Sequence, residues 1–157
     1  MKFTTENFFD DEGFLINGPL LIKPQVFQDS RGEFFESWNK RDFEKFLGNV
    51  KFVQENQSIS AKGVLRGLHF QAQPKAQGKL IMCANGEIFD VFVDIRLDSK
   101  TFKKYSYVNI SSSNKYILWI PEGFAHGFLS LSHNTRVVYK TTEFWHKNSE
   151  RSLLWND

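Results

Sequence analysis

The sequence predicts an all-β fold, arranged as a sandwich, jelly roll or barrel, with one short helix. Short strand-like segments recur along the chain, with turn residues between them. Aromatic residues make up 16% of the chain and include 17 phenylalanines, which suits a core filled by flat side chains on strands. A length of 157 residues is that of one domain, so residues 1–157 are expected to fold as a single unit.

The predicted elements follow in chain order. A strand at 20–24 is stopped by Pro24, and a turn at 29–32 leads into a second strand at 33–38. Asn39 is the expected N-cap of a helix over 41–47 that ends at Gly48. Further strands are expected at 50–56, 64–71, 79–84, 87–95, 105–110, 115–120, 125–131 and 135–142. Asn85 and Gly86 both tolerate positive φ, which predicts a hairpin between the strands that flank them.

The predicted strand at 87–95 has two unlike faces. One is wholly apolar and is predicted to face the core: Phe89, Val91, Val93 and Ile95. The other places Asp90 and Asp94 among large apolar side chains, as a half-polar cavity inside a barrel would. The pattern alone slightly favours the simpler interpretation, in which the two aspartates point to solvent.

Charge and cysteine content limit the possible partners and compartments. The formal net charge is +2, which gives no reason to expect nucleic acid or a membrane surface as a partner, although a local cationic pocket could still hold a phosphorylated ligand. No apolar run has the length of a membrane span or a signal peptide. Cys83 is the single cysteine, so a reducing compartment is favoured and a cytoplasmic location is expected.

Several polar residues are candidates for chemistry. Arg66 and His69 lie three residues apart in one predicted strand, and a bulge at Gly67 would turn both inward. The residues alone favour a structural role for His69, because a histidine near apolar residues is more often hydrogen-bonded than catalytic. By the same reasoning Lys79 is expected at the surface, and Tyr139 in the core with its hydroxyl paired.

His126 lies between Gly123 and Gly127, which indicates either a close backbone approach or a plain barrel corner. Small β-barrels often hold metals, but position 71 is Gln71 where a second histidine would be common. His69 and His126 alone are too few ligands. The sequence has no phosphate-binding glycine loop, dinucleotide fingerprint or serine nucleophile elbow. No metal and no cofactor are therefore expected.

The segment GVLRGLHFQ at 63–71 strongly resembles the signature of the dTDP-4-dehydrorhamnose 3,5-epimerases. Other segments resemble that family and follow in the same order: 27–37, 52–56, 76–80, 86–91, 120–128, 139–140 and 155–157. Within 52–56, Glu55 stands where the family usually has aspartate. The resemblance runs from about Gly18 to the end of the chain. So many ordered motifs make it highly specific.

The resemblance implies a cupin-type jelly roll, usually a homodimer that exchanges N-terminal strands. It implies cofactor-free inversion of C3 and C5 of a dTDP-linked 4-keto-6-deoxyhexose (dTDP-4-dehydro-6-deoxyglucose to dTDP-4-dehydro-L-rhamnose) through an enolate. His69 would be the base, Tyr139 the proton donor, and Lys79 would carry positive charge near the enolate. Arg66, Asp90 and His126 would contact the diphosphate and the sugar. The nucleotide contacts, some of them across the dimer, would be Arg31, Glu36, Gln54, Glu55 and Asn56. Phe144 would stack on the base, and Glu150 would be a further substrate contact.

The resemblance further implies a family segment beyond position 157 that contributes a lysine and an aspartate, the aspartate pairing with the base. Either the sequence is a shortened piece of a longer chain, or the protein naturally lacks that segment. In the second case we expect weaker activity, a single epimerisation, or a substitute carboxylate such as Asp90. Three alternatives stay open. They are an epimerase that inverts one carbon or uses another nucleotide, a sugar-nucleotide-binding protein without turnover, and a metal-dependent cupin oxygenase, against which Gln71 counts.

Overall fold

The computed structural model describes residues 2–156. The first half of the chain forms β1 (Phe3–Phe9), β2 (Leu15–Pro24), β3 (Val26–Asp29), β4 (Gly32–Phe35), α1 (Lys40–Leu47), β5 (Gln54–Ser60) and β6 (Leu65–Gln71). The second half forms β7 (Lys79–Asn85), β8 (Glu87–Asp94), β9 (Tyr105–Ser111), β10 (Ile117–Ile120), β11 (Phe124–Ser130), β12 (Thr135–Thr141), the 3-10 helix η1 (Lys147–Ser149) and β13 (Glu150–Ser152).

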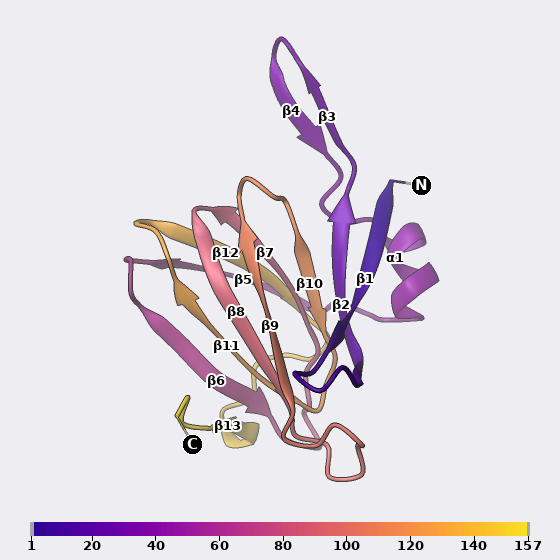
Figure 1. Ribbon diagram of the computed structural model, residues 1–157, viewed down its shortest axis with the longest axis vertical. Coiled ribbons are helices and arrows are strands. Elements are labelled where there is room, and N and C mark those ends of the chain that lie inside the picture. The colour runs from indigo at the N-terminus through magenta and orange to yellow at the C-terminus, as the bar shows by residue number, and fades with distance from the viewer. Residues whose placement is uncertain (1, 157) are drawn as a thin grey trace.

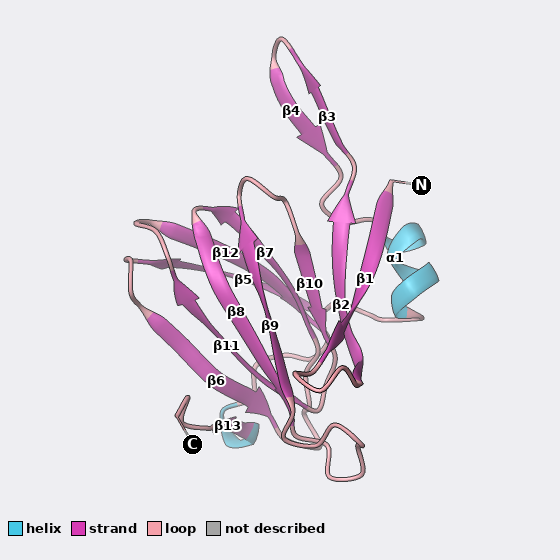
Figure 2. Ribbon diagram, in the orientation of Figure 1, coloured by secondary structure: helices cyan, strands magenta, loops and turns pink. Residues whose placement is uncertain are grey.

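Two antiparallel sheets face each other and form a sandwich (Figure 1, Figure 2). One has six strands in the order β1-β2-β10-β7-β12-β5, and the other has five in the order β13-β6-β11-β8-β9. Strands β3 and β4 pair with each other as a separate hairpin that projects from the sandwich at the top of Figure 1. The predicted all-β class with one α-helix is confirmed. No helix within residues 2–156 is long and apolar enough to cross a membrane.

The core has two parts, because the six-stranded sheet buries apolar side chains on both faces. The larger cluster lies between the sheets and includes Ile81, Ile88, Phe92, Leu118 and Phe128. The smaller lies under α1, where Phe43 packs with Phe3 and Trp119, among others. Helix α1 begins and ends as predicted: the Asn39 side chain accepts a hydrogen bond from the backbone of Asp42, and Gly48 closes the helix with a positive φ.

The predicted hairpin at Asn85-Gly86 is wrong in its pairing. Gly86 does adopt a positive φ of 82°, but β7 pairs with β10 and β12, whereas β8 pairs with β9 and β11. The turn therefore carries the chain from one sheet to the other. The strand expected at 50–56 is shifted to Gln54–Ser60, and β1, β3 and β13 have no predicted counterpart, because they are edge or hairpin strands with few buried residues.

The preferred assignment of the two faces of β8 is also wrong. Asp90 and Asp94 are both fully buried, while Phe89, Val91 and Val93 are only half-buried on the outer face. Burial of Asp94 is supported by hydrogen bonds from Arg96, Ser99 and Thr101. Strand alternation alone shows that the faces differ. The choice of the inner face depends on the partners of the two buried carboxylates, which lie in the following loop for Asp94 and on β11 for Asp90.

Candidate functional site

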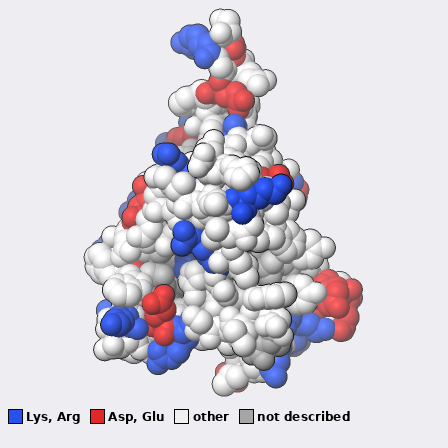
Figure 3. Space-filling view, turned by 90° about the vertical axis from the view of Figure 1, so that its left-hand side faces the viewer, with Lys and Arg blue, Asp and Glu red and all other residues white. Residues whose placement is uncertain are grey.

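A cavity of about 390 Å³ opens between the two sheets, a size common for small-molecule sites. Strands β5, β6, β7, β11 and β12 line it, and its polar side chains include Arg66, His69, Lys79, His126 and Tyr139. Figure 3 shows the side of the molecule on which β5 and β6 lie, with Lys and Arg side chains near the middle of that face. The fold thus gathers, from four strands, most of the residues expected to carry chemistry.

The bulge predicted at Gly67 is confirmed. His69 lies opposite His126 and Arg66 opposite Phe128, so β6 has one more residue than β11 over this stretch. Gly67 has a φ of 119°, and a Cβ there would lie 2.5 Å from the Cα of Gly127. Only glycine permits this close approach of the two backbones. The irregularity brings Arg66 and His69 to the same cavity, where a regular strand would separate them.

His69 is mostly buried and lies in a positively charged environment. Burial, followed by the charges of Lys79, His126 and Arg66, lowers the pKa of its imidazole to about 3. The ring is therefore neutral near pH 7, which is the form that accepts a proton. Within residues 2–156 the imidazole makes no side-chain hydrogen bond, and its closest aromatic neighbour is His126, with ring centroids 6.1 Å apart.

Lys79 is buried, which corrects the expectation of a surface lysine. It opens β7 between Ile120 and Thr141 on the neighbouring strands. Burial lowers the pKa of its ammonium to about 8, against the opposing effect of the Asp90 and Glu150 carboxylates. Lys79 is therefore still mostly charged at pH 7, and a cation buried at this cavity is well placed to stabilise a developing negative charge.

Asp90 and His126 form a buried pair behind the cavity. The Nε2 of His126 lies 2.9 Å from Oδ2 of Asp90. The proposal that Asp90 substitutes as the orienting carboxylate of His69 is wrong in this form, because its hydrogen bond goes to the other histidine. Burial raises the pKa of Asp90, and the nearby His126 and Lys79 oppose that rise.

Tyr139 lies across from Asn56 in the pairing of β12 with β5. Its side chain is partly buried, and burial raises the pKa of the phenol, so the hydroxyl keeps its proton at neutral pH. A smaller recess continues from the main cavity, with Tyr139, His69 and Lys79 shared between the two. Asn56 and Glu150 line this recess, and Oε2 of Glu150 lies 3.3 Å from the indole nitrogen of Trp145.

Comparisons with known proteins agree with this geometry. The sequence model of the dTDP-4-dehydrorhamnose 3,5-epimerases matches residues 14–157. The chain belongs to this family. The dTDP-4-dehydrorhamnose 3,5-epimerase of Shigella flexneri is 57% identical over 139 residues, which are 88% of this chain and 77% of that protein.

Solved structures with bound ligands are also similar. The dTDP-6-deoxy-D-glucose-3,5-epimerase of Legionella pneumophila, in complex with dTDP-4-keto-L-rhamnose, is 45% identical with a TM-score of 0.89, over 98% of this chain and 78% of that one. The epimerase of Bacillus anthracis, with TDP and PPi bound, is 41% identical with a TM-score of 0.89, over 98% and 86%. The expected family and cupin-type fold are thereby confirmed.

The remaining predicted contacts lie outside the cavity. Arg31 is at the tip of the β3–β4 hairpin, where it pairs with Asp29. Glu36 forms an ion pair with Lys2. Glu55 pairs with Lys140. Gln54 is closer to the site, because its side chain binds Asn56 and the backbone of Trp145. Phe144, beside Trp145, is 60% exposed.

Gln71 has a role that the sequence analysis did not assign. Its buried amide donates to the carbonyls of Lys75 and Phe144 and accepts from the backbone of His146. These bonds hold the loop that presents Phe144 and Trp145 beside the smaller recess. Gln71, which stands where a metal-binding barrel would commonly have a second histidine, therefore supports this loop. Among residues 2–156, no three His, Cys, Asp or Glu side chains are grouped as a metal site requires.

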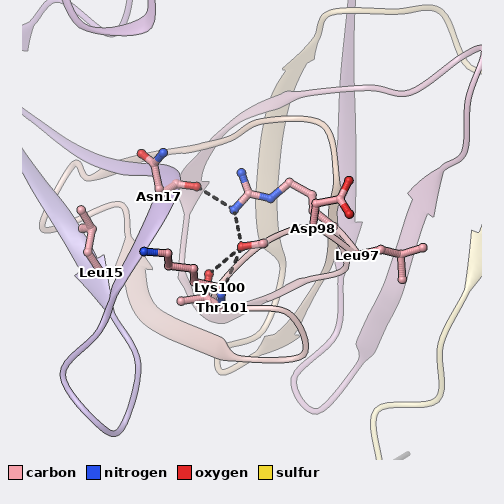
Figure 4. A pocket seen from close by; sticks show the side chains of 8 residues that line it. Leu15, Asn17, Leu97, Asp98, Lys100 and Thr101 are labelled. Carbon is pink, nitrogen blue, oxygen red and sulfur yellow. Dashed lines mark hydrogen bonds between the residues drawn. The ribbon is translucent and has the colours of Figure 1, made fainter.

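A larger hollow of about 760 Å³ lies elsewhere, between Leu15, Asn17 and the loop 96–101. Figure 4 shows its lining, with hydrogen bonds from the guanidinium of Arg96 to the carbonyl of Asn17 and to Ser99. Arg96 also pairs with Asp94. The charge of Arg96 is therefore already neutralised by Asp94 within the fold. The catalytic candidates lie in the other cavity.

Proposed function

We propose that this chain inverts C3 and C5 of dTDP-4-dehydro-6-deoxyglucose to give dTDP-4-dehydro-L-rhamnose, with His69 as the base. The observation that carries the proposal is the position of three groups around one cavity. These are a neutral imidazole at His69, a protonated phenol at Tyr139 and a buried ammonium at Lys79. Together they match the needs of proton abstraction beside a ketone.

The 4-keto group acidifies the hydrogens on C3 and C5, so a base can remove one and leave an enolate. His69 accepts this proton, because its imidazole is unprotonated near pH 7. The negative charge that forms on the enolate oxygen is stabilised by Lys79. Tyr139 then returns a proton to the opposite face of the carbon, which inverts the centre. His69 then releases its proton to solvent and Tyr139 regains one, after which the same two proton transfers at the second carbon complete the reaction.

The rest of the substrate is assigned by the chemistry of its parts. Arg66, the second cation of the cavity after Lys79, binds the diphosphate. Its guanidinium is held by a hydrogen bond to the hydroxyl of Ser60. His126 borders the sugar, with Asp90 behind it. Gln54, Asn56, Glu150 and Phe144 contact the nucleotide. Arg31, Glu36 and Glu55 lie away from the cavity of their own chain. We therefore assign these three residues to a partner's site in a homodimer. We further propose that the enzyme is cytoplasmic and needs no metal or cofactor.

The test is solvent exchange at the two carbons. The purified chain is incubated with dTDP-4-keto-6-deoxyglucose in D2O, and C3 and C5 are followed by NMR. Deuterium should enter both positions, and His69→Ala should abolish entry while the exposed-histidine control His133→Ala retains it. Entry at one carbon alone would indicate a single-carbon epimerase. Nucleotide binding without any exchange would indicate a binding protein and overturn the proposal.

A further inference from the structure

Ser58 lies on β5 and lines the main cavity. Its hydroxyl oxygen is buried and has no hydrogen-bond partner among residues 2–156. The neighbouring cavity wall offers it none, because Val137 lies opposite it on β12 and Leu65 lines the same cavity. A buried hydroxyl without a partner is unfavourable in the free protein and is uncommon in folded proteins. We therefore expect its partner to arrive with a ligand.

The side chains of β5 alternate between solvent and the interior. Gln57 and Ile59 are exposed, whereas the residues between and beside them are half-buried or buried. Asn56, Ser58 and Ser60 therefore share the inner face, where neighbours in the row are about 7 Å apart. Asn56 lines the smaller recess and Ser58 lines the main cavity. Strand β5 thus presents a row of polar groups that leads from the recess into the main cavity, with Ser58 in the middle.

Arg66 stands at the Ser60 end of this row. Its Nε donates to the hydroxyl of Ser60 at 3.0 Å, and this is the only side-chain hydrogen bond of the guanidinium within residues 2–156. The two terminal nitrogens of Arg66 remain available to a ligand in the cavity that both Arg66 and Ser58 line. A phosphoryl group carries negative charge and several acceptor oxygens, so it can accept from the guanidinium and from a serine hydroxyl together. A sugar hydroxyl would leave the charge of Arg66 without a counter-ion.

We propose that Ser58 is a binding residue for the diphosphate, with its hydroxyl donating to a phosphoryl oxygen of the group that Arg66 binds. A rotation about χ1 between staggered positions turns the oxygen to the ligand. The assignment to a substrate diphosphate rests on the proposed function. Because the diphosphate does not react, this contact is equally strong before and during the proton transfers. Ser58 therefore contributes to substrate affinity and not to kcat.

The direct test is calorimetric titration of the chain with dTDP and with thymidine, which has no phosphate. Ser58→Ala should weaken dTDP binding about 10- to 100-fold, the range expected for one hydrogen bond to a charged group, and leave thymidine binding unchanged. Ser58→Thr keeps a hydroxyl and suits a strand, so it should retain most of the dTDP affinity. Gln57→Ala, on the exposed side of the same strand, is the matched control and should bind both ligands like the wild type.

Thermal unfolding of the ligand-free proteins separates this role from a structural one. Ser58→Ala should melt no lower than the wild type, because a hydroxyl without an internal partner has no hydrogen bond to lose. A clearly lower melting temperature would overturn the inference, and so would unchanged dTDP binding in folded Ser58→Ala. Weaker binding of the sugar-bearing substrate alone would assign the hydroxyl to the sugar and overturn it as well. Binding of dTDP needs no turnover, so an inactive wild type that shows the Ser58 effect would count against the proposed function alone.

Discussion

Replacing Gly67 with alanine should destabilise the protein by about 3 kcal/mol. The backbone there has a φ of 119°, and a non-glycine residue in such a region costs about 1–3 kcal/mol. The new Cβ would also lie 2.5 Å from Gly127 Cα and 2.6 Å from the carbonyl oxygen of His126. Both are backbone atoms of a paired strand, so relief requires the strands to move apart, and overpacking of this kind adds roughly 1–3 kcal/mol.

Gly63→Ala is the matched control. Gly63 also has a positive φ, of 83°, but no atom lies within 4 Å of its added Cβ. It should therefore show only the conformational cost, about 1 kcal/mol. Denaturant unfolding measures both variants, and the difference of about 2 kcal/mol corresponds to roughly 6 °C in melting temperature for a chain of this size.

The same pair of variants tests the site. Folded Gly67→Ala should lose proton exchange at C3 and C5, because the bulge that turns both Arg66 and His69 toward the cavity cannot form unchanged. Gly63→Ala should retain it. Equal stability and equal activity in the two variants would refute the argument that this backbone approach builds the site.

Three further predictions concern charge and packing. Hydrogen bonds from Arg96 and its neighbours outweigh the effect of burial and lower the pKa of Asp94 to about 2. The stability that this carboxylate contributes, about 2 kcal/mol, should thus be complete above pH 4 and lost as the pH falls from about 4 to 2. Acid titration of the unfolding free energy should show this loss, and Asp94→Asn should remove it. Activity should fall above about pH 8 as Lys79 deprotonates, and in Lys79→Arg any remaining activity should lack that limb because a guanidinium stays charged. Phe92→Ala, at a fully buried position, should cost about 3–5 kcal/mol in denaturant unfolding, whereas Phe14→Ala, 61% exposed, should stay within about 0.5 kcal/mol.

Local signals predicted much of the fold. Asn39 and Gly48 placed the helix to within one residue, because capping depends on a few neighbouring positions. Alternation placed β6 through β12 closely, apart from a shorter β10. The pairing of β7 with β10 and β12 could not be predicted in this way, since an Asn-Gly turn can close a hairpin or carry the chain to a second sheet.

What the sequence by itself determined was the all-β class, the helix, the bulge at Gly67 and, through its ordered motifs, the family. These depend on residue type and spacing along the chain. Only the tertiary structure decided that Lys79 and Asp90 are buried, that Asp90 bonds to His126 rather than His69, and that Arg31 lies on a projecting hairpin. The reason is physical: burial and charge coupling depend on which strands lie opposite each other, and strands distant in sequence meet only after the two sheets pack.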